Sequence, residues 1–260
     1  MAKEQVSSIL RAMQILECFM DSETEWTLKA LAERLDLPTT TVFRQVSTLA
    51  GRQYLVQDPI RKSYQAGPRL VMLASSILSQ SDLRRLARPE LERLSDAVQE
   101  TINLSILLDH DIFYLDKVET HRSVVCNTRI GSRAPAYATS CGKVILANLG
   151  EAETARFFRW MEERAKPLTQ RTITDPAKLL EELETARTQG FAMDYGEIEA
   201  GLVCYGAPVY NMAGKIAADA SISGPEYRML EEQPFMIQEL RKTAANVSRL
   251  LGYASPAPGL

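Results

Sequence analysis

The stretch from Thr27 to Leu49 constrains the fold most, because its apolar residues have the spacing of two short helices joined by a tight turn. In the first half they recur at i, i+3, i+4 and i+7, on one helix face, as Leu28, Leu31, Ala32 and Leu35. Pro38 disfavours helix at the residue before it but fits the first turn of a second helix. The second half repeats the spacing with Val42, Val46 and Leu49. This pattern predicts a helix-turn-helix.

The second predicted helix has a polar face without carboxylates. Its outward residues are hydroxyls, an amide and a guanidinium, namely Thr39, Thr40, Thr41, Arg44, Gln45 and Thr48. Threonine and glutamine can hydrogen-bond base edges or phosphates, arginine can bind guanine with two hydrogen bonds, and N–H groups at a helix start attract phosphate. A solvated helix in a helical hairpin explains this face alone equally well.

The next segment favours the DNA-binding interpretation. Residues 52–57 and 63–65 have the pattern of two strands around a basic turn, which is the wing of a winged helix-turn-helix. From Thr39 to Arg69 five basic residues accompany one acid, although the whole chain has a net charge of -3. We therefore expect three of the basic residues to contact the phosphates of double-stranded DNA, namely Arg52, Arg61 and Lys62.

Composition excludes several classes of protein. A chain of 260 residues with 45% hydrophobic content can form a small domain and a larger one with its own core. No apolar run approaches the roughly 20 residues of a membrane span and no signal-peptide core is present, so we expect a cytoplasmic protein without membrane contact. The four cysteines lack C-x-x-C spacing and only two histidines are present, which argues against a metal, a cofactor or an enzyme.

Four regions are expected along the chain. Residues 1–67 form the winged helix-turn-helix domain, including a helix at 7–19 that Ser7 or Ser8 caps. Residues 68–82 form a linker helix whose apolar stripe can be buried against a second subunit. Residues 83–253 form a second domain, and residues 254–260, rich in proline and glycine, form a flexible tail.

The second domain alternates strands and helices. Strands are expected at 102–108, 112–118, 123–128, 201–209 and 215–223. Helices are expected at 83–99, 140–149, 151–164, 175–189 and 226–251. Asp175 has the position of an N-cap, and Gly190 that of a helix stop. This order predicts an α+β domain around one antiparallel sheet.

Small polar residues near strand ends in this apolar domain indicate a pocket for a small molecule. Ser221 and Ser223 are two residues apart in a strand and therefore share a face. The loop at 131–132 can offer backbone N–H groups to a carboxylate, and Asp194 and Cys204 bracket a glycine-rich segment that can return there. Plain alternatives exist, because the serines can be surface residues, Cys204 a buried apolar residue and Asp194 a turn residue.

Three segments resemble, in content and order, the IclR family of bacterial transcription regulators. They are RIGSRAPAYATSCGKVILANL at 129–149, GFAMDYGEIEAGLVCYGAPVYNMAG at 190–214 and ASISGP at 220–225. With the winged helix-turn-helix and the linker helix, the resemblance spans nearly the whole chain. It implies a dimerising linker helix and a GAF-like effector domain. It also implies dimers or tetramers of two dimers that bind palindromic operator DNA and respond to small organic acids.

The resemblance also assigns the effector site. It implies that the loop of Gly131 and Ser132 holds the effector carboxylate, with further contacts from Asp194, Cys204, Ser221 and Ser223. The chain departs from the family pattern at 39–41, where Thr-Thr-Thr replaces Lys-Ser-Thr, and after Cys204, where Tyr205 replaces a small aliphatic residue. Tyr205 can add an aromatic surface to the pocket. Candidates for the apolar wall of the pocket are Leu104, Tyr114 and Tyr137.

Two other functions compete with the leading hypothesis of a homo-oligomeric, ligand-responsive transcription regulator. A thiol enzyme or redox sensor could use Cys204 or Cys141, but it needs a thiolate held by positive charge and usually a resolving thiol. Lys143 is near Cys141 in the sequence, but no second cysteine is placed beside either thiol. An RNA-binding winged helix is disfavoured because no aromatic stacking surface is evident.

Overall fold

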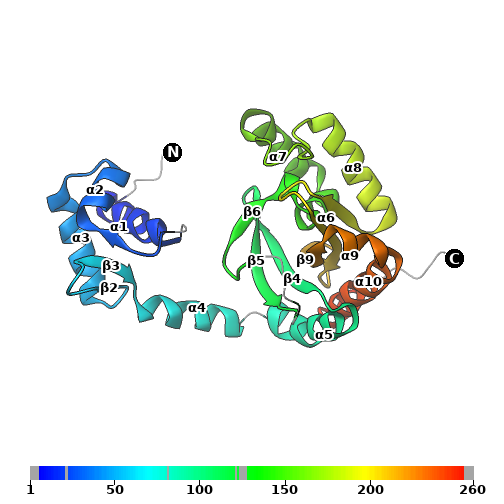
Figure 1. Ribbon diagram of the computed structural model, residues 1–260, viewed down its shortest axis with the longest axis horizontal. Coiled ribbons are helices and arrows are strands. Elements are labelled where there is room, and N and C mark those ends of the chain that lie inside the picture. The colour runs from blue at the N-terminus through cyan, green and yellow to red at the C-terminus, as the bar shows by residue number, and fades with distance from the viewer. Residues whose placement is uncertain (1–5, 21–22, 81, 121, 123–127, 255–260) are drawn as a thin grey trace. The chain divides into compact units, whose positions relative to one another are not determined.

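The computed structural model describes residues 6–20, 23–80, 82–120, 122 and 128–254. The chain forms two compact units, Met1–Ser81 and Asp82–Leu260 (Figure 1). The expected α+β class is confirmed, with a helix-turn-helix in the first unit and an antiparallel sheet in the second. Among the described residues, no helix has the length and apolar character needed to span a membrane.

Three helices build the first unit. They are α1 (Ser7–Glu17), α2 (Leu28–Leu35) and α3 (Thr39–Gly51). The predicted apolar faces meet in one core made of Ile15, Cys18, Leu31, Ala32, Val42, Val46, Leu55 and Tyr64. Thr27 caps α2 by accepting a hydrogen bond from the N–H of Ala30 at 3.2 Å. The expected cap of α1 is wrong, because Ser7 and Ser8 lie inside its first turn and Val6 precedes it.

The wing follows α3 as predicted. Strand β2 (Leu55–Gln57) pairs with β3 (Ser63–Ala66), which also pairs with β1 (Trp26–Thr27). Strand β2 is shorter than the expected 52–57, because Gln53 has a φ of 63° and keeps the chain in a turn. Helix α4 (Pro68–Gln80) then begins at the proline that the sequence suggested.

A six-stranded antiparallel sheet in the order β6-β5-β4-β9-β8-β7 forms the centre of the second unit. Its strands are β4 (Thr101–Leu108), β5 (Asp111–Val118), β6 (Arg133–Pro135), β7 (Ala192–Tyr195), β8 (Leu202–Tyr210) and β9 (Ile216–Pro225). Strands β6 and β7 were not predicted, because a segment of three or four residues is too short to show the alternation of a strand. The strand predicted at 123–128 lies outside the described residues except for Thr128.

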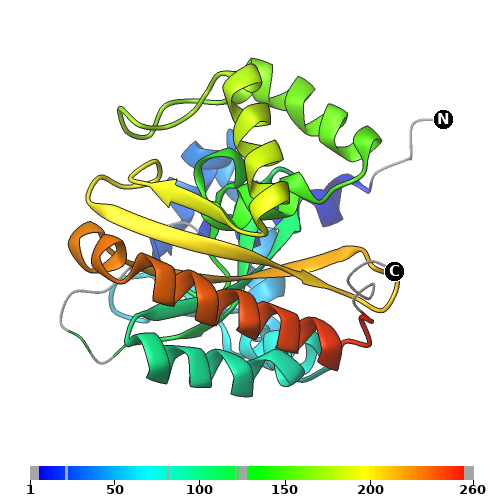
Figure 2. The same cartoon turned by 90° about the vertical axis from the view of Figure 1, so that its right-hand side faces the viewer.

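Helices cover both faces of this sheet (Figure 2). One face carries α5 (Asp82–Val98) and α10 (Gln233–Leu250), and the other carries α6 (Ser140–Ala147), with α7 (Glu151–Arg164) and α8 (Pro176–Gln189) further out. The single final helix expected at 226–251 is wrong. It is divided at Glu232 into α9 (Glu226–Glu231) and α10, because Pro234 lacks an N–H and occupies the first turn of a new helix.

The two faces of the sheet differ in chemistry. The face under α5 and α10 is apolar and includes Ile102, Leu104, Val203, Tyr205, Ala220 and Ile222. The face under α6 is polar yet equally buried, and it includes Thr101, Asn103, Ser105, Asp219, Ser221 and Ser223. Helix α6 lies close to this face because Gly206 has no side chain, and a Cβ there would come within 2.9 Å of the Ser140 carbonyl.

Candidate functional site

Helix α3 presents the predicted polar face to solvent. Thr39, Thr40, Arg44 and Thr48 are exposed, and Thr41 and Gln45 are half-buried. The Thr48 hydroxyl donates a hydrogen bond to the Arg44 carbonyl at 2.8 Å, so it is partly occupied within the helix. Phe43, which is 53% exposed on the same helix, was not among the predicted residues. It lies three residues before Val46, which suggests a place near the core, so the helical pattern carried no signal for its exposure.

The wing carries less free positive charge than the sequence suggested. Arg61 Nη1 lies 3.3 Å from a Glu25 carboxylate oxygen, and Glu25 lies outside the segment in which charges were counted. Asp58 holds the turn by accepting hydrogen bonds from the N–H groups of Arg61 and Ile60, which lower its pKa. Lys62 and Arg52 are exposed. Glu25 therefore offsets part of the positive charge of Arg61, and we expect Lys62 to attract a phosphate more strongly than Arg61 does.

A cavity of about 470 Å³ lies on the polar side of the sheet. Four of the six predicted effector residues line it, namely Ser132, Asp194, Cys204 and Ser223. Tyr114 also lines it, as suggested, together with Leu168, Ile198 and Leu202. Ser221 lies behind the wall, where its hydroxyl accepts a hydrogen bond from the Cys141 thiol at 3.2 Å.

Other expected parts of the wall are absent from this lining. Leu104 and Tyr205 are on the apolar face of the sheet, and the Tyr205 hydroxyl donates to the Met229 carbonyl at 3.0 Å. The Tyr137 hydroxyl instead donates to the Lys166 carbonyl at 2.9 Å. Since neighbouring strand residues point to opposite faces, Cys204 in the wall places Tyr205 on the other side.

The loop at 131–132 does not offer bare N–H groups. Gly131 donates its N–H to the Tyr114 carbonyl at 2.8 Å, and Ser132 donates to the Arg129 carbonyl at 3.0 Å. The cavity instead meets the start of α6, where Thr139, Ser140 and Cys141 line it. The first N–H groups of a helix lack intrahelical partners and carry partial positive charge, so this end favours an anion. The sequence signal was a threonine N-cap before a short apolar helix.

Two polar atoms in this wall are buried and have no hydrogen-bond partner in the described part of the chain. They are Asp194 Oδ2 and Ser140 Oγ. The other Asp194 oxygen accepts a hydrogen bond from the Glu197 N–H at 2.7 Å. Burial raises the pKa of Asp194 to about 7, so the carboxyl group is partly protonated at neutral pH. In that form it can donate a hydrogen bond to a ligand oxygen.

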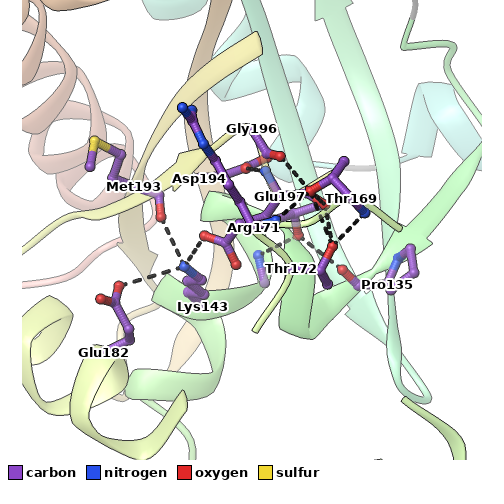
Figure 3. A network of polar contacts seen from close by, with 12 residues as sticks. Pro135, Lys143, Thr169, Arg171, Thr172, Glu182, Met193, Asp194, Gly196 and Glu197 are labelled. Atoms are coloured by element: carbon purple, nitrogen blue, oxygen red, sulfur yellow. Dashed lines mark hydrogen bonds and ion pairs between the residues drawn. The ribbon is translucent and has the colours of Figure 1, made fainter. Parts of the chain in front are cut away.

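A buried lysine lies next to this wall (Figure 3). Lys143 is 1% exposed, and its Nζ donates to the Met193 carbonyl at 3.1 Å and to the Glu197 carboxylate. Burial raises the pKa of Glu197 despite this ion pair. Lys143 Nζ also lies 3.5 Å from a carboxylate oxygen of Glu182, so one ammonium group pairs with two carboxylates, Glu182 and Glu197. The charge of Lys143 also opposes the effect of burial on the pKa of the nearby Asp194. Nothing in the sequence revealed this pairing, because Lys143 and Glu197 are 54 residues apart.

A second segment fixes the loop that contains Glu197. The Thr169 hydroxyl donates to the Gly196 carbonyl at 2.7 Å, and the Thr172 hydroxyl donates to the Glu197 carbonyl at 2.7 Å (Figure 3). The same loop supplies Ile198 to the cavity. The segment 169–172 therefore helps to shape the cavity without lining it.

The Cys141 thiol does not have the properties of a reactive site. Cys141 and Cys204 both line the cavity, but burial, followed by the nearby Asp219, raises the pKa of Cys141 well above its ordinary value. A nucleophilic cysteine requires the opposite shift. Among the residues described, no group of three or more His, Cys, Asp or Glu side chains could hold a metal ion.

A larger groove of about 790 Å³ lies between the ends of α6, α7 and α8. It is lined by residues such as Leu149, Phe158, Leu180 and Arg187, and by none of the predicted effector residues. In the described part of the chain, none of the residues that line this groove has a buried side-chain polar atom without a hydrogen-bond partner. The smaller cavity is therefore the better candidate for a specific polar ligand.

Comparisons with known proteins agree with these observations. The family described as bacterial transcriptional regulator IclR C-terminal matches residues 75–249, and the IclR helix-turn-helix domain matches residues 8–59. The HTH-type transcriptional regulator BhcR of Paracoccus denitrificans is 35% identical over 224 residues, which are 86% of this chain and 79% of that protein.

Solved structures give the same result. The IclR protein of Thermotoga maritima has a TM-score of 0.76 and 29% identity, covering 96% of this chain and 100% of that one. An IclR homologue of Microbacterium hydrocarbonoxydans, solved with 4-hydroxybenzoate, has a TM-score of 0.83 and 26% identity, covering 94% and 98%. The chain belongs to the IclR family of bacterial transcriptional regulators, DNA-binding proteins that are not enzymes.

Proposed function

We propose that this cytoplasmic regulator senses a small organic acid, aliphatic or aromatic, in the 470 Å³ cavity. The observation that carries the proposal is the pair of buried atoms without partners, Asp194 Oδ2 and Ser140 Oγ, beside the N-terminus of α6. Buried polar groups are normally hydrogen-bonded, so we expect a ligand or a water molecule to form hydrogen bonds with these two atoms. The relative solved with 4-hydroxybenzoate supports an acid as this ligand.

The six residues predicted from the resemblance take different parts in this site. Ser132, Asp194, Cys204 and Ser223 contact the acid, whereas Ser221 supports Cys141 and Gly131 shapes the loop before Ser132. The helix dipole of α6 attracts the carboxylate, and the apolar side chains Leu168, Ile198 and Leu202 surround the rest of the molecule.

In the DNA-bound form, α3 enters the major groove of the operator. Arg44, Gln45 and the threonines at 39–41 meet base edges or the nearest phosphates. Arg52 and Lys62, with a smaller contribution from Arg61, contact the phosphate backbone beside them. Residues 1–67 act as the DNA-binding domain, and residues 83–253 act as the effector domain.

A homodimer is the smallest form that suits these surfaces, and two dimers can pair into a tetramer. Apolar side chains on α4 are exposed in the chain alone, with Val71 at 66% and Met72 at 62%. Ile9 and Met13 on α1 are also exposed. A second copy can cover such residues. Two recognition helices would then contact half-sites about 34 Å apart, and the linker at 68–82 would relate the two domains.

The test is binding to the protein's own upstream promoter region at fixed salt, titrated with aliphatic and aromatic acids that include 4-hydroxybenzoate. We expect specific binding whose affinity one acid changes by about 5-fold or more. Ser140→Ala, which removes one of the two atoms without partners, should weaken the response to that acid. Specific binding that no acid changes would contradict the sensing role, and binding without sequence preference would contradict the assigned recognition helix.

A further inference from the structure

Strand β5 contains an irregularity next to the cavity. Tyr114 pairs with Ser105 and Asp116 pairs with Leu104, so Leu115 is an extra residue that forms a β-bulge. Paired residues share a face of the sheet, and Ser105 and Leu104 are on opposite faces. Tyr114 and Asp116 therefore point to opposite sides, although residues two apart in a regular strand point to the same side.

On the polar side, Tyr114 is tied to the loop that forms part of the cavity. Its side chain lines the cavity. Its carbonyl accepts the N–H of Gly131 at 2.8 Å, and its N–H donates to the carbonyl of Ser132 at 3.1 Å. Ser132 itself lines the cavity. A ligand that displaces this loop must therefore also displace the backbone of β5 at Tyr114.

On the other side, Asp116 holds the start of α5. Asp116 is 0% exposed, and its Oδ1 accepts hydrogen bonds from Arg88 Nη1 at 3.0 Å and Arg84 Nη2 at 3.4 Å. Arg88 Nη1 also donates to the Lys117 carbonyl at 2.8 Å. Within residues 82–87, all of them described, Ala87 alone is fully buried, so apolar packing fixes this turn weakly.

Helix α5 begins at Asp82, two residues after α4 ends at Gln80. Each link from cavity to linker is thus a direct contact or a short piece of chain. The links run from the loop at 131–132 to Tyr114, through the bulge at Leu115 to Asp116, and from there to Arg84 and Arg88.

We propose that the bulge of β5 and the ion pairs of Asp116 transmit occupancy of the cavity to the linker helix. The proposal rests on the proposed function, because it names the residues through which the acid changes DNA affinity. Asp116 acts as a positioning residue, since it does not line the cavity. Packed elements of this kind switch between discrete arrangements, and the acid favours one of them by binding it more tightly.

The test separates acid binding from the response to acid. Calorimetry measures the Kd of the acid, and promoter binding with and without saturating acid measures the response. In Asp116→Asn we expect the acid Kd to stay within about 3-fold of wild type, whereas the acid-induced change in DNA affinity falls below about 2-fold. Asp96→Asn is the matched control, because Asp96 is an exposed aspartate further along α5, away from the linker. It should keep both quantities.

Arg84→Gln is a second variant in case Asp116→Asn does not fold, since Arg88 still pairs with the buried carboxylate. It should reduce the response in the same way. An Asp116→Asn or Arg84→Gln protein with the full response overturns this proposal alone. A variant that loses acid binding also overturns it, because Asp116 would then be part of the cavity structure. A wild-type protein that binds no acid overturns the proposed function as well.

Discussion

On α3, Arg44 and Thr40 are exposed to solvent, whereas Asp194 in the cavity wall and Lys143 next to it are each 1% exposed. Both regions present polar side chains to the partners proposed above. The α3 side chains are solvated in the free protein, so their replacement changes binding with little effect on stability. Those near the cavity are desolvated on folding, so their replacement changes stability and binding together.

The largest effect is expected for Lys143→Met. This substitution removes the ammonium group that the buried Glu197 carboxylate contacts, and it leaves uncompensated charge in the interior. We expect the free energy of unfolding to fall by about 3–5 kcal/mol, measured by urea denaturation. Arg44→Ala, the matched loss of one exposed cation, should change it by no more than about 0.5 kcal/mol. Equal losses in the two variants would remove the distinction between the regions.

Asp219 should make stability depend on pH. It is fully buried, Oδ2 lacks a partner in the described structure, and burial raises its pKa from 3.8 to about 7. Because the folded state holds this proton more tightly, its contribution is complete below pH 3.8 and is lost as pH rises through about 7. The contribution is up to about 4 kcal/mol.

Asp219→Asn should therefore reduce the loss of stability between pH 5 and pH 8, as measured by chemical denaturation. Asp58→Asn is the control from the DNA-binding unit. The pKa of Asp58 is lowered by backbone hydrogen bonds, so it stays ionised throughout this range and its removal should leave the pH dependence unchanged. A wild-type protein equally stable at both pH values would contradict the assignment.

Arg44→Ala should weaken binding to the specific operator by about 1–3 kcal/mol and leave binding to unrelated DNA nearly unchanged. The exposed guanidinium on α3 is the side chain best suited to form two hydrogen bonds with guanine. Fluorescence anisotropy with operator and scrambled duplexes at one salt concentration measures both affinities. A uniform loss on both duplexes would instead make Arg44 a phosphate contact.

Acid binding should weaken as pH rises above 7. An ionised acid brings a negative charge next to Asp194, whose ionisation burial and the nearby Glu197 already disfavour, so it binds best when Asp194, with a pKa of about 7, keeps its proton. We expect up to about tenfold weaker binding per pH unit above 7, or about 1.4 kcal/mol. Asp194→Asn should bind with little dependence on pH. Calorimetry from pH 6 to 9 would also detect the uptake of a proton.

The smallest effect distinguishes the two cations of the wing. Lys62→Ala should reduce the slope of log K against log salt by about 1, because one phosphate contact is lost. Arg61→Ala should reduce it less, since Glu25 lies 3.3 Å from the Arg61 guanidinium. Glu25→Gln should then increase the salt dependence by freeing Arg61. Equal slopes for the two alanine variants would show that Glu25 does not hold Arg61 when DNA is bound.

The same difference in solvent exposure explains what could be predicted from the sequence. The periodicity of Val42 and Val46 located the outward face of α3. Among the described residues, no other segment covers this face, so the local pattern was enough to predict it. In contrast, the alternation in β4 and β9 is typical of strands with one exposed face, yet Ser105 and Asp219 are fully buried beneath α6. Periodicity defines the faces of a strand but does not reveal what covers them.

The effector residues were suggested by small polar residues near strand ends and were assigned roles through the resemblance to a family. Ser221 and Gly131 still took places other than those expected, because a motif gives a position and not the direction of each hydrogen bond. The bulge at Leu115 and the Lys143 ion pair with Glu197 depend on contacts between distant segments, so no local pattern could reveal them. The division at Pro234 had a local signal in the proline itself.

Gly206 has a consequence for how such regulators acquire new ligands. It lets the first turn of α6 lie directly on the sheet, and any side chain there would push that turn away from the strands that carry Cys204 and Ser223. The residue at 206 therefore sets the depth of the cavity without touching the molecule inside it. A single change from glycine to alanine shifts this turn while every proposed contact residue stays the same, so the size of the ligand that fits can evolve separately from the chemistry that binds it.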